Sequence, residues 1–476
     1  MITLSYNFGI AALSRLILGG ISLVIISFLT RSLGPAGYGD YSLIFAYLYI
    51  FTTLADLGLY TILIRDISRP QADESGILSN IFSLRLMAIV FFLVVGIFIS
   101  IFLPYSKDVK IGVIAASIFA VLSSLYQILT AVFQKYLKLY YVSIADVVAR
   151  LCQLLLIFYI VKIGYNFLAF VWVIVISEFI HFFLLFLFTQ KLVKVNLVFK
   201  PAYWLKILKT SVPVAISLVF TLLYFKIDTV LLSFMKPAQD VGIYSVAYKV
   251  LEVVIFLPAI YAGLLMPALS RYALENISQF TKTYRRGFNA LSVFALPTMA
   301  YLFLRADDVI RIMGGDKFDQ AGSVLKILSL AIMLIFFGNL GGNSLVALDL
   351  QKKSIWIYFA GAIFNVAGNL LLIPTYSYFA AAWITVSTEL LITIAMFWLI
   401  KKETGVSLEI KIFWRSALAA AITAAIVYSL DPKFIQATIL FLIYFPILFI
   451  LGGINRDDLR ELFSLKADSK TMAAIE

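Results

Sequence analysis

The chain has 476 residues, of which 62% are hydrophobic and 13% are charged. Because an ordinary soluble domain carries about 25% charged residues, this composition excludes a soluble globular protein and indicates a polytopic membrane protein. The formal net charge of +12 is assigned to loops that meet anionic lipid headgroups. The sequence offers no basic soluble stretch that would predict nucleic-acid binding.

Long apolar runs recur from the beginning of the chain to its end. A helix of about 20 apolar residues crosses the hydrocarbon core, and it satisfies its own backbone hydrogen bonds in lipid. The sequence therefore predicts an all-α integral membrane protein. We predict fourteen spans, at about 5–30, 41–64, 77–103, 111–133, 141–162, 166–189, 208–234, 243–267, 288–304, 322–346, 355–373, 378–400, 412–430 and 434–453.

The predicted orientation follows from Lys and Arg, which favour cytoplasmic loops. Loops after even-numbered spans, together with the C-terminal tail, hold 23 of these residues, whereas loops after odd-numbered spans hold nine. Both termini are therefore predicted to face the cytoplasm, with the protein in the plasma membrane. The first run is too long for the core of a signal peptide and is predicted to remain as a helix.

An internal repeat divides the predicted spans into two sets of six. The tetrapeptide GDYS at residues 39–42 reappears as GIYS at 242–245, 203 residues later. At an offset of 211 residues, five further positions match, among them Tyr165, Trp172 and Glu178, which recur as Tyr376, Trp383 and Glu389. Six is an even number, so the two copies insert in the same orientation as a parallel repeat.

The repeat predicts two six-helix lobes and an addition at the C-terminus. The N-lobe comprises residues 1–200, the C-lobe residues 201–405, and residues 406–476 contribute two extra helices and a cytoplasmic tail. In transporters with such repeats, the substrate site lies between the halves, and rocking of one half against the other gives alternating access. A transporter rather than an enzyme is therefore expected.

The run FLTRSLGPAGYGDYSLIFAYLYIFTTLADLGLYTILIRDISR, at residues 28–69, resembles the N-terminal signature of polysaccharide-biosynthesis transporters. These are the Wzx-type flippases of lipid-linked oligosaccharides, in the superfamily that also holds the MATE exporters and the lipid II flippase. The resemblance implies a V-shaped, MATE-like pair of lobes around a cavity for a diphosphate-linked glycan. It marks no single ligand residue.

Four cations in the predicted spans are candidates for binding a diphosphate headgroup. A charge inside the bilayer is costly and faces a cavity or a partner, and a guanidinium binds phosphate through paired hydrogen bonds. The candidates are Arg15, Arg85, Arg150 and Lys249. The alternatives are snorkelling of Arg15 to the membrane surface or its pairing with Asp56, and an ion pair of Arg150 with Asp146.

Four asparagines are candidates for contacting sugars, because an amide both donates and accepts hydrogen bonds. They form two pairs at i,i+4 spacing, Asn339 with Asn343 and Asn365 with Asn369. The alternative is hydrogen bonding between helices.

Two carboxylates, Asp228 and Glu252, are candidates for binding a coupling ion, either sodium or a proton, and the alternative is a salt-bridge network. Glu178 and His181 are predicted to pair within one lobe. One histidine and one cysteine, Cys152, give no basis for a zinc site, and neither a metal, another cofactor nor a catalytic residue is predicted.

The sequence thus favours a flippase that moves a polyprenyl-diphosphate-linked oligosaccharide from the cytoplasmic to the outer leaflet. The alternatives are a lipid II-type flippase, a cation-coupled multidrug antiporter of the same fold, or a membrane enzyme or scaffold of glycan assembly. An enzyme would rely on the loop at 305–320, with Asp307, Asp308 and Asp316. Expected partners are the lipid-linked substrate, membrane lipids and glycan polymerases or ligases, and the protein is expected to function as a monomer.

Overall fold

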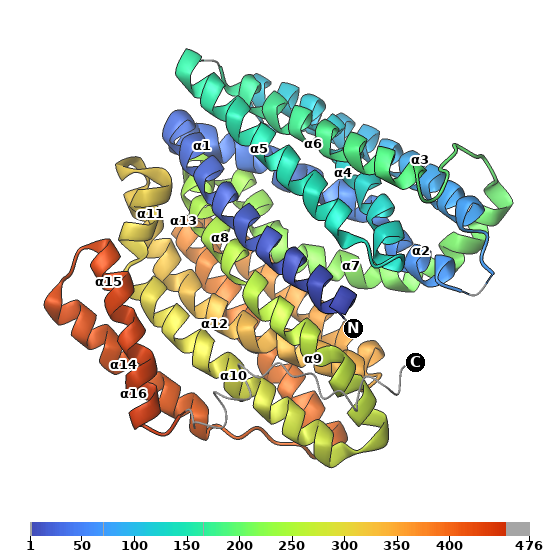
Figure 1. Ribbon diagram of the computed structural model, residues 1–476. Helices are drawn as coiled ribbons and strands as arrows, with labels where there is room; N and C mark the ends of the chain where they lie inside the picture. The colour runs from blue at the N-terminus through green and yellow to red at the C-terminus, as the bar shows by residue number, and fades with distance from the viewer. Residues whose placement is uncertain (1, 70, 165, 454–476) are drawn as a thin grey trace. The chain divides into compact units, whose positions relative to one another are not determined.

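The computed structural model is built of helices joined by short connections (Figure 1). It describes residues 2–69, 71–164 and 166–453, with side chains described from residue 18 onward except at 210 and 212–225. No strand occurs among these residues, which confirms the predicted all-α class.

The helices follow the predicted apolar runs along the chain. Their bounds are α1 (Ile2–Asp56), α2 (Leu59–Ile67), α3 (Glu74–Phe102), α4 (Lys107–Lys135), α5 (Leu139–Ile163), α6 (Phe167–Gln190), α7 (Pro201–Met235), α8 (Ala238–Val254), α9 (Phe256–Glu275), α10 (Ile277–Leu304), α11 (Ala306–Gly314), η1 (Asp316–Phe318), α12 (Asp319–Ala347), α13 (Gln351–Thr404), α14 (Lys411–Leu430), α15 (Phe434–Leu440), η2 (Phe441–Ile443) and α16 (Tyr444–Ile450).

Two of these helices each carry two predicted spans and break between them. Helix α13 has 54 residues, about 80 Å at 1.5 Å per residue, whereas the hydrocarbon core is about 30 Å thick. Its backbone leaves the helical region at Ser377, where φ is 52°. Helix α1 breaks at Gly34, where φ is 66°, a left-handed value that glycine adopts without penalty. Each of these helices therefore changes direction between its two predicted spans.

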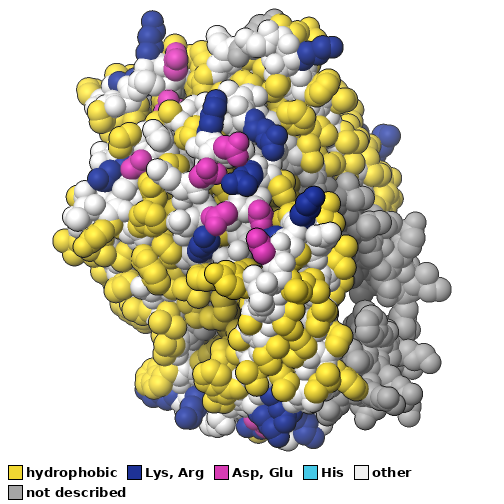
Figure 2. All heavy atoms as spheres, turned by 90° about the vertical axis from the view of Figure 1, so that its left-hand side faces the viewer, with side chains coloured by type: hydrophobic (Ala, Val, Ile, Leu, Met, Phe, Trp, Pro, Cys, Tyr) yellow, Lys and Arg dark blue, Asp and Glu magenta, His cyan; other side chains and the backbone are white. Residues whose placement is uncertain are grey.

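Ten helical segments among the described residues are long and apolar enough to cross a membrane. Large hydrophobic side chains are exposed along them, such as Phe91 at 63% and Leu371 at 75%. Figure 2 shows hydrophobic side chains over most of the face that it draws, with charged side chains gathered in its upper part and along its lower edge. The protein is accordingly a multi-pass membrane protein.

The chain forms two compact units. The first contains Met1–Val253, Val309–Val324 and Ile355–Thr388, and the second contains Val254–Asp308, Leu325–Ser354 and Glu389–Glu476. Each unit draws on separate stretches of the chain. The lobes predicted at 1–200 and 201–405 stay a prediction.

In the first unit, the two copies of the repeated tetrapeptide contact each other. A side chain at Gly39 of α1 would place its Cβ 1.8 Å from the carbonyl oxygen of Ala238, and one at Gly242 of α8 would place it 1.9 Å from that of Pro35. Only glycine allows backbones to approach so closely. The matching glycines therefore fix the crossing of α1 and α8, which line the candidate site described below.

In the second unit, the helices after residue 410 pack against α10. Val293 and Leu296 of α10 form one buried cluster with Ala419 and Ala420 of α14 and with residues of α16. Burial of this cluster fixes the additional C-terminal helices on the unit.

Candidate functional site

A cationic cavity of about 330 Å³ lies inside the first unit, among α1, α5, α7 and α8. Its charged lining residues are Arg150 of α5, Lys226 of α7, and Lys249 and Glu252 of α8. Three cations face one carboxylate, so the cavity carries a surplus of two positive charges. It brings together three of the residues predicted from the sequence, namely Arg150, Lys249 and Glu252.

Glu252 forms ion pairs with both lysines of the cavity. Lys249 Nζ lies 2.8 Å from Glu252 Oε2, and Lys226 Nζ forms an ion pair with Glu252 Oε1. The lysine side chains remain 28% and 41% exposed, for Lys226 and Lys249 respectively. An ammonium group has three donors, so each lysine can donate to an anion while keeping its bond to Glu252.

Arg150 is the third cation of the cavity. It lies in the first copy of the repeat, whereas Lys226 and Lys249 lie in the second copy. Its Nη1 donates to Gln153 Oε1 at 2.8 Å, one turn further along α5. The residue is exposed to the cavity, and the rest of its guanidinium can donate a pair of hydrogen bonds to a phosphate. Among the described residues, Arg150 forms no ion pair with Asp146, the alternative predicted from the sequence. Asp146 Oδ1 lies 3.1 Å from His181 Nε2 instead.

Asp228 occupies a second polar site, fully inside the first unit and separate from the cationic cavity lining. It is 1% exposed. Its Oδ1 accepts from Asn369 Nδ2 at 2.8 Å, and its Oδ2 accepts from Thr385 Oγ1 at 2.9 Å and from the Tyr244 hydroxyl at 3.1 Å. All three donors are neutral, and within the described side chains Asp228 takes part in no ion pair.

The surroundings of Asp228 are rich in oxygen atoms. Asn369 Nδ2 also donates to Asn365 Oδ1 at 3.1 Å, and both asparagines are fully buried. The Oδ1 atom of Asn369 is buried and accepts no hydrogen bond from the described residues. A hard cation binds carboxylate, amide and hydroxyl oxygens. The cluster of Asp228, Asn365, Asn369 and Thr385 thus has the oxygen ligands that a small cation needs. Asn365 and Asn369 do not line the cationic cavity.

Arg85 lies apart from the cationic cavity. Its Nη1 is 2.6 Å from Asp56 Oδ1, Nε donates to Ser124 Oγ at 2.6 Å, and Nη2 donates to Gln127 Oε1 at 3.0 Å. From the sequence, Asp56 was considered as a partner of Arg15. In the structure, Asp56 forms its ion pair with Arg85. The side chain of Arg15 lies outside the described residues.

Asn339 and Asn343 lie in the second unit and bond to their own helix. Asn339 Nδ2 donates to the Ile335 carbonyl at 2.9 Å, and Asn343 Nδ2 donates to the Asn339 carbonyl at 2.8 Å. Their side chains are half-buried. Asn365 and Asn369 belong to the first unit.

His181 joins α5 to α6 rather than pairing with Glu178 alone. It is 4% exposed, and besides its contact with Asp146 its Nδ1 lies 3.6 Å from Glu178 Oε1. The ring of Tyr126 covers it, with ring centroids 4.2 Å apart. This cluster ties three helices together.

The loop that an enzyme would use is held by ion pairs. Asp307 lies 2.6 Å from Lys326 and Asp308 lies 3.0 Å from Arg305. Asp316 lies 3.3 Å from Arg311. Each aspartate is thus engaged with a cation at the molecular surface.

Three residues of the two sites were not predicted as ligands from the sequence. Lys226 lies only two residues before Asp228, but its ammonium group forms an ion pair with Glu252 of α8. Tyr244 belongs to the repeated GIYS motif, and its position in a repeat is the signal that could have marked it. Thr385 carries no signal in the sequence.

Comparison with known proteins gives two family matches. The family model described as "Polysaccharide biosynthesis protein" matches residues 4–273, and the MatE model matches residues 213–371. The probable flippase AglR of Haloferax volcanii is 29% identical over 167 residues, which cover 33% of this chain and 34% of AglR. The uncharacterized membrane protein MJ1068 of Methanocaldococcus jannaschii is 32% identical over 94 residues, 20% of this chain and 18% of that protein. Both alignments span well under half of the relatives' lengths.

Solved structures share the fold at low sequence identity. A lipid II flippase MurJ in an inward closed conformation matches with a TM-score of 0.77 and 16% identity, over 96% of this chain and 100% of that one. An inward-facing MATE-family multidrug transporter matches with a TM-score of 0.64 and 13% identity, over 83% and 98%. The fold is therefore the one that MurJ and the MATE transporters share.

Proposed function

Because the chain belongs to the polysaccharide biosynthesis protein family, we propose that it is a flippase that moves a polyprenyl-diphosphate-linked oligosaccharide from the cytoplasmic to the outer leaflet. The observation that carries the proposal is the cavity with Arg150, Lys226 and Lys249, whose surplus positive charge suits a diphosphate. The relative AglR is named a probable flippase, which supports the same activity.

Alternating access provides the mechanism. The headgroup binds in the cavity while the lipid tail stays in the bilayer, so the polar glycan never crosses hydrocarbon. Rocking of two six-helix lobes then exposes the cavity on the other side. The proposal includes fourteen spans and cytoplasmic termini, which the charge distribution supports. Membrane lipids and glycan polymerases or ligases complete the proposed set of partners, around a functional monomer.

Coupling to a cation is proposed at Asp228. A buried carboxylate with only neutral hydrogen-bond donors leaves one negative charge uncompensated, and a sodium ion or a proton would neutralise it. Glu252, the other candidate, is already neutralised by two lysines. We therefore assign the coupling ion to Asp228 and not to Glu252.

The test is transport in proteoliposomes of a fluorescent short-chain polyprenyl-diphosphate oligosaccharide, followed by its accessibility to an external quencher. We compare the parent with the double variant Lys226→Gln/Lys249→Gln. Protein-dependent movement in the parent that falls at least about tenfold in the variant supports the proposal, since charge-assisted hydrogen bonds contribute about 1.5–3 kcal/mol. Lys162→Gln, at an exposed position at the end of α5, is the matched control.

Two other outcomes point elsewhere. If the parent moves no diphosphate probe but exports cationic dyes in exchange for sodium or protons, it is an antiporter of the same fold, a reading that the MatE match over residues 213–371 supports. If it moves only a probe carrying a peptide-bearing disaccharide, it is a lipid II-type flippase. Unchanged transport in the double variant would remove the lysines from the headgroup site.

A further inference from the structure

A second cavity, of about 310 Å³, opens in the first unit beside the cationic one. It is formed by α1, α3 and α4, and it shares three lining residues with the cationic cavity, namely Phe45, Tyr49 and Phe119. The two cavities are thus adjacent, with an aromatic wall in common. A ligand with its phosphates among Arg150, Lys226 and Lys249 can therefore extend past these rings.

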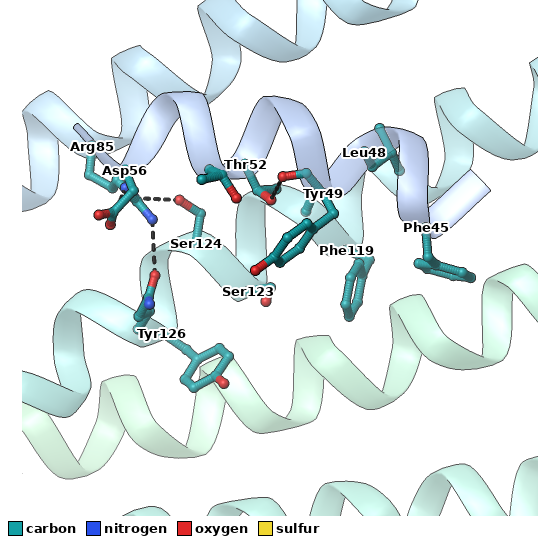
Figure 3. Close-up of a pocket in the computed structure, with 13 residues that line it drawn as sticks. Phe45, Leu48, Tyr49, Thr52, Asp56, Arg85, Phe119, Ser123, Ser124 and Tyr126 are labelled. Carbon is teal, nitrogen blue, oxygen red and sulfur yellow. Dashed lines mark hydrogen bonds and ion pairs between the residues drawn. The ribbon is translucent and has the colours of Figure 1, made fainter. Parts of the chain in front are cut away.

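The far end of this second cavity is polar but electrically neutral. Arg85 and Asp56 form the ion pair described above, and Arg85 is 1% exposed. In Figure 3 this pair lies at one end of the pocket and Phe45 at the other, with Tyr49 and Phe119 between them. An anion gains little here because the charge of Arg85 is compensated by Asp56.

Between the two ends, groups that both donate and accept hydrogen bonds line the space. They include the hydroxyls of Thr53 and Ser123 and the amide of Gln127. The ring of Tyr49, 44% exposed, points across the pocket toward Ser123 (Figure 3). Hydroxyl and amide side chains can both donate hydrogen bonds to the hydroxyl groups of a ligand and accept hydrogen bonds from them.

The chemistry of this lining matches one class of ligand. A pyranose has apolar C–H faces, which pack on aromatic rings, and hydroxyls around its edge, which need mixed donors and acceptors. A volume of about 310 Å³ is at the lower end of small-molecule sites, about 300–1,000 Å³, and fits one sugar ring rather than a chain of them. An acyl chain would offer no hydrogen-bonding partner to the hydroxyls of Thr53 and Ser123.

We propose that the pocket lined by Tyr49, Phe119, Ser123 and Gln127 binds a single neutral sugar, the one joined directly to the diphosphate. The inference rests on the proposed function, because it places the diphosphate in the adjacent cationic cavity. The pocket then recognises the first sugar, while Arg85 and Asp56 form its neutral end. Sugar recognition is assigned to α1 and α4 instead of the asparagines of α12 and α13.

The experiment measures binding of defined probes to the purified full-length protein in nanodiscs. The bare probe is geranylgeranyl diphosphate. Four sugar probes carry a glucose, galactose, mannose or N-acetylglucosamine residue on the diphosphate, and a fifth carries glucuronic acid. The dissociation constant of each probe is determined for the parent and for Tyr49→Leu, Tyr49→Phe and Ser123→Ala.

At least one neutral sugar probe is expected to bind the parent about tenfold more tightly than the bare probe, and more tightly than the glucuronic acid probe. Tyr49→Leu is expected to remove this advantage, Tyr49→Phe to keep most of it, and Ser123→Ala to reduce it severalfold. The bare probe should bind Ser123→Ala as tightly as the parent, because Ser123 lines the second cavity and not the cationic one. Ser117→Ala is the matched control, because that hydroxyl lies on the same helix and donates to backbone carbonyls of Val113 and Ile114.

The outcomes separate this inference from the proposed function. If the bare probe binds but no neutral sugar adds affinity, the sugar pocket is refuted and the headgroup site stands. If the advantage survives in Tyr49→Leu and Ser123→Ala, the sugar binds elsewhere and the pocket is again refuted. If no probe binds, the headgroup site fails and the inference built on it falls with it.

Discussion

Asp228 and Glu252 are both acidic residues in apolar helices of the first unit, yet their surroundings differ in charge. Glu252 contacts Lys226 and Lys249, so its negative charge is more than compensated. Asp228 accepts hydrogen bonds from Asn369, Thr385 and Tyr244, which carry no charge. A carboxylate of the first kind organises cations for an anionic ligand, whereas one of the second kind is suited to bind a cation itself.

The difference teaches that the identity of a buried acidic residue does not define its role. Its role depends on whether the neighbouring helices place cationic side chains or neutral hydrogen-bond donors next to it. A buried charge without a counter-ion costs several kcal/mol, so the Asp228 site is stabilised when a cation enters. The cavity around Glu252 has the opposite imbalance and is stabilised when an anion enters.

The largest effect is expected for Asp228→Asn. A ligand present at 100 times its dissociation constant stabilises the folded protein by about 2.7 kcal/mol. The unfolding temperature of the parent should therefore rise by several degrees with sodium but not with an equal concentration of a bulky organic cation, and the variant should show no sodium response. A sodium response that persists in Asp228→Asn would contradict the site.

Asp66→Asn is the matched control for that measurement. Asp66 pairs with Arg65 and Arg69 near the end of α2, so its loss should leave the sodium response unchanged. If the parent responds to low pH instead of sodium and Asp228→Asn abolishes that response, the coupling ion at the same site is a proton.

A smaller loss is expected for Arg150→Gln, on the anion side of the comparison. Charge-assisted hydrogen bonds contribute about 1.5–3 kcal/mol, or about 10- to 150-fold in affinity. The dissociation constant for geranylgeranyl diphosphate should rise by this factor, and Arg150→Lys should lie between the variant and the parent. Equal binding by Arg150→Gln and the parent would show that the guanidinium faces the cavity without touching the headgroup.

Asn369→Ala should weaken sodium binding more modestly. The amide of Asn369 donates to Asp228 and leaves its Oδ1 free for a cation, and a neutral hydrogen bond contributes about 0.5–1.5 kcal/mol. A sodium titration of the unfolding temperature should give a dissociation constant raised about two- to tenfold. Asn343→Ala is the control, because its amide bonds to its own helix, and a similar loss there would argue for a general effect of removing asparagines.

The sequence was sufficient to predict the all-helical membrane class of the fold. Apolar runs of about 20 residues leave few alternatives in lipid, and the all-helical structure agrees. The family match over residues 4–273 confirms the resemblance seen in residues 28–69. The repeat also marked two glycines that bring α1 and α8 into contact.

The partners of the buried charges could not be predicted in the same way. Spacing of three or four residues shows which side chains share a face of one helix. It does not show which other helix meets that face. Asp56 was therefore considered as a partner of Arg15, whereas it pairs with Arg85. Asn369 was a candidate for contacting sugar or for hydrogen bonding between helices, and its Nδ2 lies 2.8 Å from Asp228 Oδ1.

The smallest effect, and the one of opposite sign, is expected for Glu252→Gln. A phosphate competes with Glu252 for Lys226 and Lys249, and partly exposed ion pairs contribute about 0–1 kcal/mol. Without that competition, the affinity for geranylgeranyl diphosphate should rise up to about fivefold, while transport slows because release of the headgroup becomes harder.

Glu275→Gln, whose carboxylate pairs with Arg271 on α9, should change neither affinity nor transport. A fall in affinity in Glu252→Gln would instead show that the carboxylate is needed to hold both lysines in the cavity. The sign of this one change therefore decides whether Glu252 competes with the diphosphate or prepares the site for it.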